Sequence, residues 1–369
     1  MRLQLQHVHR TTMDGSSFIQ DFNLSVNEKE FLVLAGPRGC GKSTILRMIA
    51  GLEDMDAGEI YIDDVLVNEL EPKDRSVAMV FSNSVLYPDM TVLDNMAFSL
   101  KQKKMSKAEI TELVEEAAEL LGIRNILKKK PRALNPEQAQ KVILGRAIAK
   151  KPKILLLDDP FVSLDDKLKL QMWFEVSVLY QKMDTTIVYV TNDPTAAMAL
   201  GTKVVIMKHG RMMQMDAPMD LYETPSSVFA AEFFGNPPIN LFEAHIMEED
   251  GYLMFEFAGY RMPILHNKAM VLRDRGYIDK DVIVGIRPED IKEEQIFVQT
   301  AGESVIKALI RVKQMLGATT YLDIQVGGIE LIASVNPRTT ARAGDMVKLA
   351  FDARKLHFFD KKTQDIIVN

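Results

Sequence analysis

GPRGCGKST, residues 36–44, is the stretch that decides the fold of the first part of the chain. It matches the pattern G-x-x-x-x-G-K-[ST]. The apolar run FLVLAG (31–36) precedes it, and STILRMIAGL (43–52) follows it with apolar residues at helical spacing. A strand, a glycine-rich loop and a helix in this order bind phosphate through backbone N–H groups and the helix N-terminus. The alternative, a glycine-rich turn that matches by chance, fits this strand–loop–helix context less well.

Each part of this loop has an expected role. Backbone N–H groups surround the β-phosphate, Lys42 neutralises β- and γ-phosphate oxygens, and Ser43 can bind Mg²⁺. The nucleotide-binding residues expected in the loop are Gly36, Pro37, Arg38, Gly39, Cys40, Gly41, Lys42, Ser43 and Thr44. Downstream, ILLLDDP (154–160) has the pattern of a second buried strand, and Asp158 at its end can hold the magnesium ion through water. Cys40 could be a reactive thiol near a helix N-terminus, but packing is the simpler interpretation.

Residues 1–235 have the pattern of an α/β domain. Near-continuous apolar runs alternate with helical stretches, which is typical of a parallel sheet covered by helices on both faces. These runs are FLVLAG (31–36), ILLLDD (154–159) and TIVYVT (186–191). A helical insert is expected at about residues 84–150, between the first two runs. Its clearest helix begins at Ser106, which can form a capping box with Glu109.

Residues 236–369 have a different pattern, which begins after FGNPPIN (234–240). Short β-rich runs separated by turn residues are typical of small antiparallel barrels. These runs are YLMFEF, VIVGIR, TTYLDIQV, IELIASV and MVKLAF. We therefore predict an all-β, OB-like small-barrel domain, with the boundary near Gly235–Pro238. Such folds can bind oligonucleotides, but this region carries 17 Lys and Arg against 19 Asp and Glu without a basic–aromatic stripe, so no nucleic acid partner is expected.

The bulk composition narrows the class of protein. The 369 residues leave room for two or three domains of roughly 150 residues each. A net charge of -6 gives no electrostatic reason to expect nucleic acid as a partner. The single cysteine excludes an intrachain disulfide and suits a reducing cytoplasm. No run approaches the ~18 apolar residues of a membrane helix, so any membrane spanning is expected from another chain.

From its first strand through the C-terminal barrels, the chain resembles the ATP-binding subunits of ABC importers for carbohydrates, of the maltose-importer type. The resemblance implies ATP and Mg²⁺ as ligands, and a second ATP-binding subunit that forms a homodimer or heterodimer with the first. It also implies integral membrane permease subunits as partners at the cytoplasmic face of the cell membrane. The C-terminal domain is implied to serve dimer contacts and regulation. The stretches that carry the resemblance are GPRGCGKSTILRMIAGLEDMDAGEIYIDD, VLYPDMTVLDNMAFSL, GRAIAKKPKILLLDDPFVSLDDKL, IVYVTNDPTAAMAL and GIRPED.

The segment that corresponds to the family's L-S-G-G-Q signature differs from it. In the family, this helix start faces the γ-phosphate held by the opposite subunit, so Asn135, Pro136, Glu137 and Gln138 are expected nucleotide-binding residues here. The Asn135 side chain can still donate a hydrogen bond, but Pro136 has no N–H to give. The Glu137 carboxylate would face a polyanion, a like-charge contact of about 4 kcal/mol at roughly 4 Å and an effective dielectric of about 20. As a helix start the segment is good, because Asn135 caps and Pro136 occupies the first turn.

Three expected catalytic residues also depart from the family pattern. Ser82 stands where a glutamine normally reaches the magnesium ion and the attacking water, and its hydroxyl is too short for that reach. Asp159 stands where a glutamate acts as general base, and it is one methylene shorter. Asn192 stands where a histidine contacts the γ-phosphate. Met13 occupies the position where an aromatic residue normally stacks on adenine.

These departures beside an intact phosphate loop indicate a subunit that binds MgATP and hydrolyses it slowly or not at all. In a heterodimer with a complete sister subunit, both composite sites would be compromised. One alternative is a fully competent transport ATPase that tolerates the substitutions. Another is a non-catalytic scaffold or regulator outside transport. The sequence does not identify the solute.

Residues 82–100, SNSVLYPDMTVLDNMAFSL, correspond to the surface that receives the coupling helix of a membrane subunit in the family. Tyr87, Pro88 and Met90 resemble the family there. Docking is therefore expected even if catalysis is lost. The alternative for this segment is a partly buried hydrophobic loop.

Overall fold

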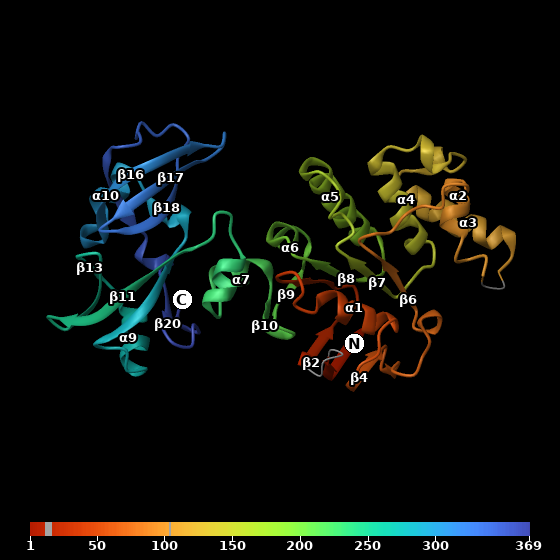
Figure 1. The fold of residues 1–369 in the computed structure, drawn as a ribbon, viewed down its shortest axis with the longest axis horizontal. Coiled ribbons are helices and arrows are strands. Elements are labelled where there is room, and N and C mark those ends of the chain that lie inside the picture. Colours follow the sequence, from red (N-terminus) through yellow and green to blue (C-terminus); the bar gives the residue numbers. More distant parts are fainter. Residues whose placement is uncertain (12–16, 103–104) are drawn as a thin grey trace. The chain divides into compact units, whose positions relative to one another are not determined.

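The computed structural model describes residues 1–11, 17–102 and 105–369, which divide into two compact units (Figure 1). The first unit is Met1–Pro218 and the second is Met219–Asn369. The second unit takes in most of α7 (Pro218–Glu223) and all of α8 (Val228–Phe233), ahead of its first strand. The domain boundary expected near residue 235 stays a prediction.

The first unit is built on a six-stranded sheet with the order β10-β9-β3-β8-β7-β6. Every neighbouring pair is parallel except β9 and β10, which confirms the predicted parallel sheet. The three predicted apolar runs form β3, β7 and β8, and β8 lies between the other two. The strands are β3 (Phe31–Ala35), β6 (Val77–Val80), β7 (Ile154–Asp158), β8 (Thr186–Thr191), β9 (Lys203–Lys208) and β10 (Arg211–Asp216).

Helices cover both faces of this sheet, which explains why its central strands are apolar throughout. Leu32 and Leu34 of β3 belong to a buried cluster with the helix α1 (Lys42–Ala50). Phe31, which points to the opposite face, meets Tyr180 of α5 (Asp166–Lys182) with ring centroids 5.3 Å apart. All five β3 residues are buried as a result. The short helix α6 (Pro194–Leu200) contacts β3 as well.

A second, antiparallel sheet in this unit was not predicted from the sequence. Its order is β2-β1-β4-β5. Its residues Leu3, Leu5 and Ile60 pack into the same buried cluster as Ile45 of α1, so α1 is enclosed between two sheets. The strands are β1 (Leu3–Thr11), β2 (Ser17–Val26), β4 (Ala57–Ile62) and β5 (Val65–Leu66).

A group of helices follows β6 and precedes β7. Its α-helices α2 (Val92–Ala97), α3 (Lys107–Leu120) and α4 (Pro136–Ile148) contact one another. The predicted capping box at the start of α3 is confirmed, because the Ser106 hydroxyl accepts from the Glu109 N–H and the Glu109 carboxylate accepts from the Ser106 N–H. No helix in the described part of the chain is long and apolar enough to cross a membrane.

The second unit is dominated by two antiparallel sheets, which confirms the predicted all-β class. Their orders are β13-β12-β11-β14-β20-β21 and β15-β19-β16-β17-β18. All five β-rich runs of the sequence form strands, and one buried cluster with Phe242, Phe255 and Phe351 joins the two sheets. The strands are β11 (Asn240–Glu249), β12 (Tyr252–Phe257), β13 (Tyr260–Pro263), β14 (Lys280–Ile286), β15 (Ile291–Lys292), β16 (Val305–Met315), β17 (Thr320–Val326), β18 (Ile329–Val335), β19 (Met346–Phe351), β20 (His357–Asp360) and β21 (Ile366–Val368).

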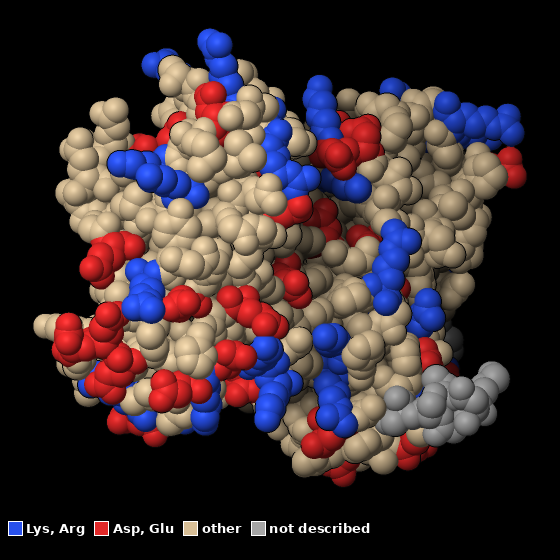
Figure 2. All heavy atoms as spheres, turned by 60° about the vertical axis from the view of Figure 1, so that its left-hand side comes forward, with Lys and Arg blue, Asp and Glu red and all other residues tan. Residues whose placement is uncertain are grey.

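Short helices complete this unit, and its surface carries both positive and negative side chains, some of them in ion pairs. Besides α7 and α8, these helices are α9 (His266–Asp274) and α10 (Gln295–Thr300). Figure 2 shows Lys and Arg side chains lying among Asp and Glu side chains on the visible face. Ion pairs of this unit include Arg273 with Glu248 at 2.8 Å and Lys361 with Glu243 at 2.7 Å.

Candidate nucleotide site

The phosphate loop spans the turn from β3 to α1, and two of its glycines have backbone conformations that disfavour a side chain. Gly36 has φ of 153°, and a Cβ there would lie 2.3 Å from the Met207 carbonyl oxygen. Gly41 has φ of 104°, and a Cβ there would lie 2.4 Å from Ile19 Cδ1. Both positions favour residues without a side chain. The loop therefore has the tight, bare backbone that a phosphate group can approach closely.

Lys42 is the first residue of α1, and its side chain folds back over the loop. Its Nζ donates to the carbonyl oxygens of Gly36 at 2.8 Å and of Pro37 at 2.7 Å. The side chain is buried, and its ammonium group lies at the cavity that the loop borders. Cys40 is buried in the same core cluster as α1, in agreement with the packing interpretation.

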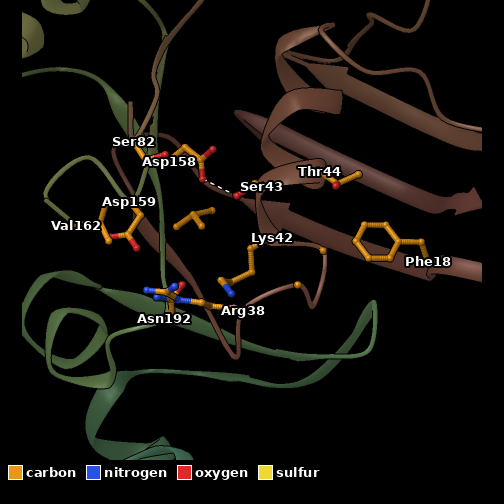
Figure 3. A pocket seen from close by; sticks show the side chains of 13 residues that line it. Phe18, Arg38, Lys42, Ser43, Thr44, Ser82, Asp158, Asp159, Val162 and Asn192 are labelled. Atoms are coloured by element: carbon orange, nitrogen blue, oxygen red, sulfur yellow. Dashed lines mark hydrogen bonds between the residues drawn. The ribbon is translucent and has the colours of Figure 1, made fainter. Parts of the chain in front are cut away.

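Ser43 and Asp158 come together from two different elements, as their expected shared role requires. The Ser43 hydroxyl on α1 donates to Oδ1 of Asp158 at 2.6 Å, and Asp158 is the buried last residue of β7 (Figure 3). Within the described residues, no group of three or more His, Cys, Asp or Glu side chains surrounds a metal position. One hydroxyl and one carboxylate suit Mg²⁺, which binds few protein groups and completes its shell with water and phosphate oxygens.

The three expected catalytic residues line the same cavity as the phosphate loop. This cavity has a volume of about 330 Å³ (Figure 3). Asp159 follows β7, Asn192 follows β8, and Ser82 follows β6, so adjacent parallel strands deliver all three to one edge of the sheet. The residues that border the cavity are Phe18, Arg38, Gly39, Gly41, Lys42, Ser43, Thr44, Ser82, Asp158, Asp159, Val162, Val190 and Asn192. Their places fit the expected roles, which stay predictions.

Asp159 has an unusual environment for a carboxyl group. Burial, followed by the nearby charges of Asp158 and Asp193, raises its pKa to about 6. Within the described part of the chain, no hydrogen bond to its carboxylate offsets this burial. A carboxylate with a raised pKa takes up a proton more readily, so the environment offsets part of the loss that the shorter side chain causes for a general base.

This environment predicts that Asp159→Asn stabilises the protein when nucleotide and magnesium are absent. The native pKa of about 6 exceeds the ordinary 3.8, so the stability that this group contributes is present below pH 3.8 and is lost as the pH rises through 6. Removing the charge should raise the free energy of unfolding by about 1–2 kcal/mol at about pH 8, and by much less near pH 4.

Chemical denaturation of the first unit's transition at both pH values measures this difference. The control is Asp166→Asn, since Asp166 is fully exposed and its removal should change stability by no more than about 0.5 kcal/mol. Equal stabilisation by Asp159→Asn at the two pH values would contradict the burial argument.

The signature segment begins α4 as predicted. Oδ1 of Asn135 accepts from the Gln138 N–H at 2.8 Å, and Oε1 of Gln138 accepts from the Asn135 N–H at 3.3 Å. Pro136 is the first helical residue. Asn135 and Pro136 are exposed, and the segment does not border the cavity of its own phosphate loop. This placement leaves it available to a second subunit.

Glu137 has an ion-pair partner that the sequence analysis did not consider. Its carboxylate lies 3.0 Å from Nζ of Lys141, one helical turn further along α4. The same ammonium lies 2.9 Å from the carboxylate of Glu175 on α5. Because Lys141 partly compensates the charge of Glu137, the repulsion of a facing phosphate is smaller than the value expected for a free carboxylate.

The adenine-stacking position was assigned to Met13, which lies outside the described residues. That assignment stays a prediction. The structure places the aromatic ring of Phe18, on β2, at the cavity that Thr44 also borders (Figure 3). The sequence analysis missed this residue. A usable signal was present, since Phe18 is the only aromatic residue between Thr11 and Asp21.

The expected docking segment borders a second cavity of the first unit, with a volume of about 370 Å³. Val85 is 75% exposed and Tyr87 is 40% exposed. The Tyr87 ring lies 4.5 Å from the ring of Phe98 and 5.7 Å from the guanidinium carbon of Arg146. A half-exposed aromatic residue held in place at the rim of a cavity suits a docking surface, and that role stays a prediction.

Comparison with known families identifies three segments. Residues 19–162 match the ABC transporter family. Residues 235–291 match the MalK OB fold domain, and residues 284–359 match the TOBE domain. The two C-terminal matches together cover nearly all strands of the second unit.

Individual relatives match over almost the whole chain. The oligosaccharides import ATP-binding protein MsmX of Bacillus subtilis is 45% identical over 362 residues, which are 98% of each chain. The trehalose/maltose import ATP-binding protein MalK of Thermococcus litoralis is 41% identical over 352 residues, which are 94% of each chain.

Solved structures match the first part of the fold. The ATP-binding cassette MJ0796, solved as a dimer bound to ADP and Pi in a post-hydrolysis state, has a TM-score of 0.51 and 29% identity. The match covers 58% of this chain and 98% of that one. The structure of cbiO1 from Clostridium perfringens has a TM-score of 0.56 over 59% of this chain and 89% of that one, and at 22% identity it shows the fold alone.

Proposed function

Because the chain belongs to the ABC transporter family of importer ATP-binding subunits of the maltose-importer type, we propose that it binds MgATP and couples to membrane permease subunits that import a sugar or a related solute. The names of MsmX and MalK, which concern oligosaccharides and trehalose or maltose, support this class of solute. The observation that carries the proposal is the convergence of Lys42, Ser43 and Asp158 at one cavity.

The phosphate loop is the proposed site of MgATP. The Lys42 ammonium and the loop N–H groups bind the β- and γ-phosphates, and Ser43 and Asp158 hold Mg²⁺. When bound, Mg²⁺ neutralises charge on the phosphate oxygens. The tight glycine positions 36 and 41 support this arrangement, since they keep the loop backbone free of side chains.

The proposed hydrolysis is slow. Asp159 replaces a longer carboxylate, and a misplacement of roughly 1 Å in a catalytic site can cost about 100-fold. Ser82 and Asn192 lack the reach of a glutamine and the imidazole of a histidine. Pro136 removes one N–H donor from the segment that faces the γ-phosphate of a second subunit. These losses act on different parts of the reaction, so they accumulate.

Two observations favour the second candidate function, a competent transport ATPase. The ion pair of Glu137 with Lys141 reduces the repulsion at the signature segment. The raised pKa of Asp159 makes its carboxylate a better proton acceptor. Measurement of ATP turnover separates the two candidates.

Co-purification tests the coupling to permease subunits. The tagged full chain, solubilised from its native membranes, should retain integral membrane subunits, and Tyr87→Glu should reduce their recovery because it places a charge at the rim of the docking cavity. Tyr252→Glu is the matched control, since Tyr252 is a 74% exposed tyrosine of the second unit. Purification of the wild-type chain without any membrane subunit would support the scaffold alternative and contradict the proposal.

Phe18 is the proposed contact for the base of the nucleotide. Stacking of a base on an aromatic side chain contributes about 1–3 kcal/mol, so Phe18→Ala should weaken MgATP binding by about five- to a hundredfold. Phe18→Trp should bind as well as wild type. Equilibrium titration measures both variants, with Phe174→Ala as the control because Phe174 on α5 is 66% exposed and outside the cavity. Unchanged binding by Phe18→Ala would refute this contact.

A further inference from the structure

Arg38 is a cation of the phosphate loop whose position suggests a specific task. Among the residues that the structure describes, its guanidinium has no hydrogen bond or ion pair, although the side chain is exposed and long enough to find one. Figure 3 shows the side chain running from the loop past Lys42 toward Asn192. It therefore points into the nucleotide cavity instead of away from it.

Arg38 stands where two cavities meet. It borders the cavity of about 330 Å³ and an adjoining one of about 230 Å³. Asp159, Val162 and Asn192 border both as well. The part of the nucleotide site that Arg38 reaches is thus the catalytic edge, at the ends of β7 and β8.

This edge is rich in negative charge before any nucleotide arrives. Asp158 and Asp159 follow one another at the end of β7, and Asp193 adds a third carboxylate near Asp159. The negative charges of these carboxylates would repel a terminal phosphate bound at this edge. Lys42 offsets them from the loop side, but its ammonium also serves the carbonyl oxygens of the loop. On the side of Asn192, Lys169 of α5 borders the smaller cavity, and its ammonium is paired with Asp166 at 3.5 Å. Among the described residues, Arg38 is the cation that borders both cavities.

We propose that Arg38 binds the terminal phosphate of a nucleoside triphosphate held by its own phosphate loop, and so makes the site prefer the triphosphate to the diphosphate. The proposal rests on the nucleotide site proposed above. Guanidinium groups suit this task because their N–H donors form paired hydrogen bonds with phosphate oxygens. Asn192, beside Arg38, adds an amide donor at the same end of the site.

Binding of MgATP and MgADP to the full chain tests the proposal. Arg38→Ala should weaken MgATP binding by about ten- to a hundredfold, the effect of losing hydrogen bonds to a charged group, and should change MgADP binding by less than about threefold. Arg38→Lys should fall between wild type and Arg38→Ala, because lysine keeps the charge without the paired donors. Arg47→Ala is the matched control, since Arg47 is exposed on α1 and does not border the cavity.

The outcomes separate this proposal from the one it rests on. If the wild-type chain binds neither nucleotide, the proposed nucleotide site is wrong. If it binds both, and Arg38→Ala leaves the ratio of MgATP to MgADP affinity unchanged, the role of Arg38 alone is wrong. The proposed role of Arg38 is supported if Arg38→Ala loses MgATP affinity selectively and Arg38→Lys loses less of it. Arg47→Ala should keep the wild-type affinity for both nucleotides.

Discussion

Restoring the family residues at five positions together should raise ATP turnover by about two orders of magnitude or more, since each of two independent catalytic defects can cost about 100-fold. The combined variant carries Ser at 135, Gly at 136 and 137, Glu at 159 and His at 192. It restores an N–H donor, removes the Glu137 carboxylate, lengthens the base and supplies an imidazole. Serine also caps helices well, so α4 should still begin at the same residue.

Single substitutions in this set should have small effects. Asn192→His alone is expected to change turnover by less than about threefold, because the base and the signature segment remain altered. The control is the combined variant with Lys42→Ala, which should return turnover to background. A large gain from Asn192→His alone, or no gain from the folded combined variant, would contradict the view that the defects accumulate. Thermal unfolding checks that the combined variant is folded.

Lys42→Ala should weaken MgATP binding by about 10- to 100-fold, because loss of charge-assisted hydrogen bonds worth about 1.5–3 kcal/mol converts at 1.4 kcal/mol per tenfold. The buried ammonium is held at the loop by the Gly36 and Pro37 carbonyl oxygens, so its position is fixed before the nucleotide arrives. Titration of the full chain with MgATP measures the change.

Lys107→Ala is the matched control for this variant. Lys107 is an exposed lysine at the start of α3 and does not border the cavity, so its removal should leave MgATP affinity unchanged. Circular dichroism shows whether Lys42→Ala keeps its helices and strands. A folded Lys42→Ala protein with wild-type affinity would mean that the nucleotide does not bind at this loop.

The sequence was most informative where one local pattern defines a structure. Such patterns involve residues within a few positions of each other. They are the loop 36–44, the capping box at Ser106 and the cap at Asn135. The structure confirms the strand, loop and helix around residues 36–44 and the helix caps at the other two positions. The C-terminal strands were predictable for the same reason, since turn residues separate alternating apolar runs.

Features that depend on contacts between distant segments were missed. The antiparallel sheet of β1, β2 and β4 escaped prediction because its half-buried strands are less apolar than β3 or β7. Phe18 reaches the nucleotide cavity because its neighbour Ile19 brings β2 against Gly41 of the loop that follows β3. The pairing of Lys141 with Glu175 joins two helices and has no local pattern, although the Glu137–Lys141 spacing of one helical turn was visible.

A single-turnover experiment tests the central claim most directly. The purified full chain, in excess over radiolabelled MgATP, is quenched at successive times and assayed for retained ATP and released phosphate. We expect the chain to retain ATP and convert it at least about tenfold more slowly than relatives with a complete signature segment, in line with the loss of catalytic alignment. Failure to retain ATP at millimolar concentrations, or conversion as fast as in those relatives, would contradict the claim that this subunit binds MgATP but hydrolyses it slowly.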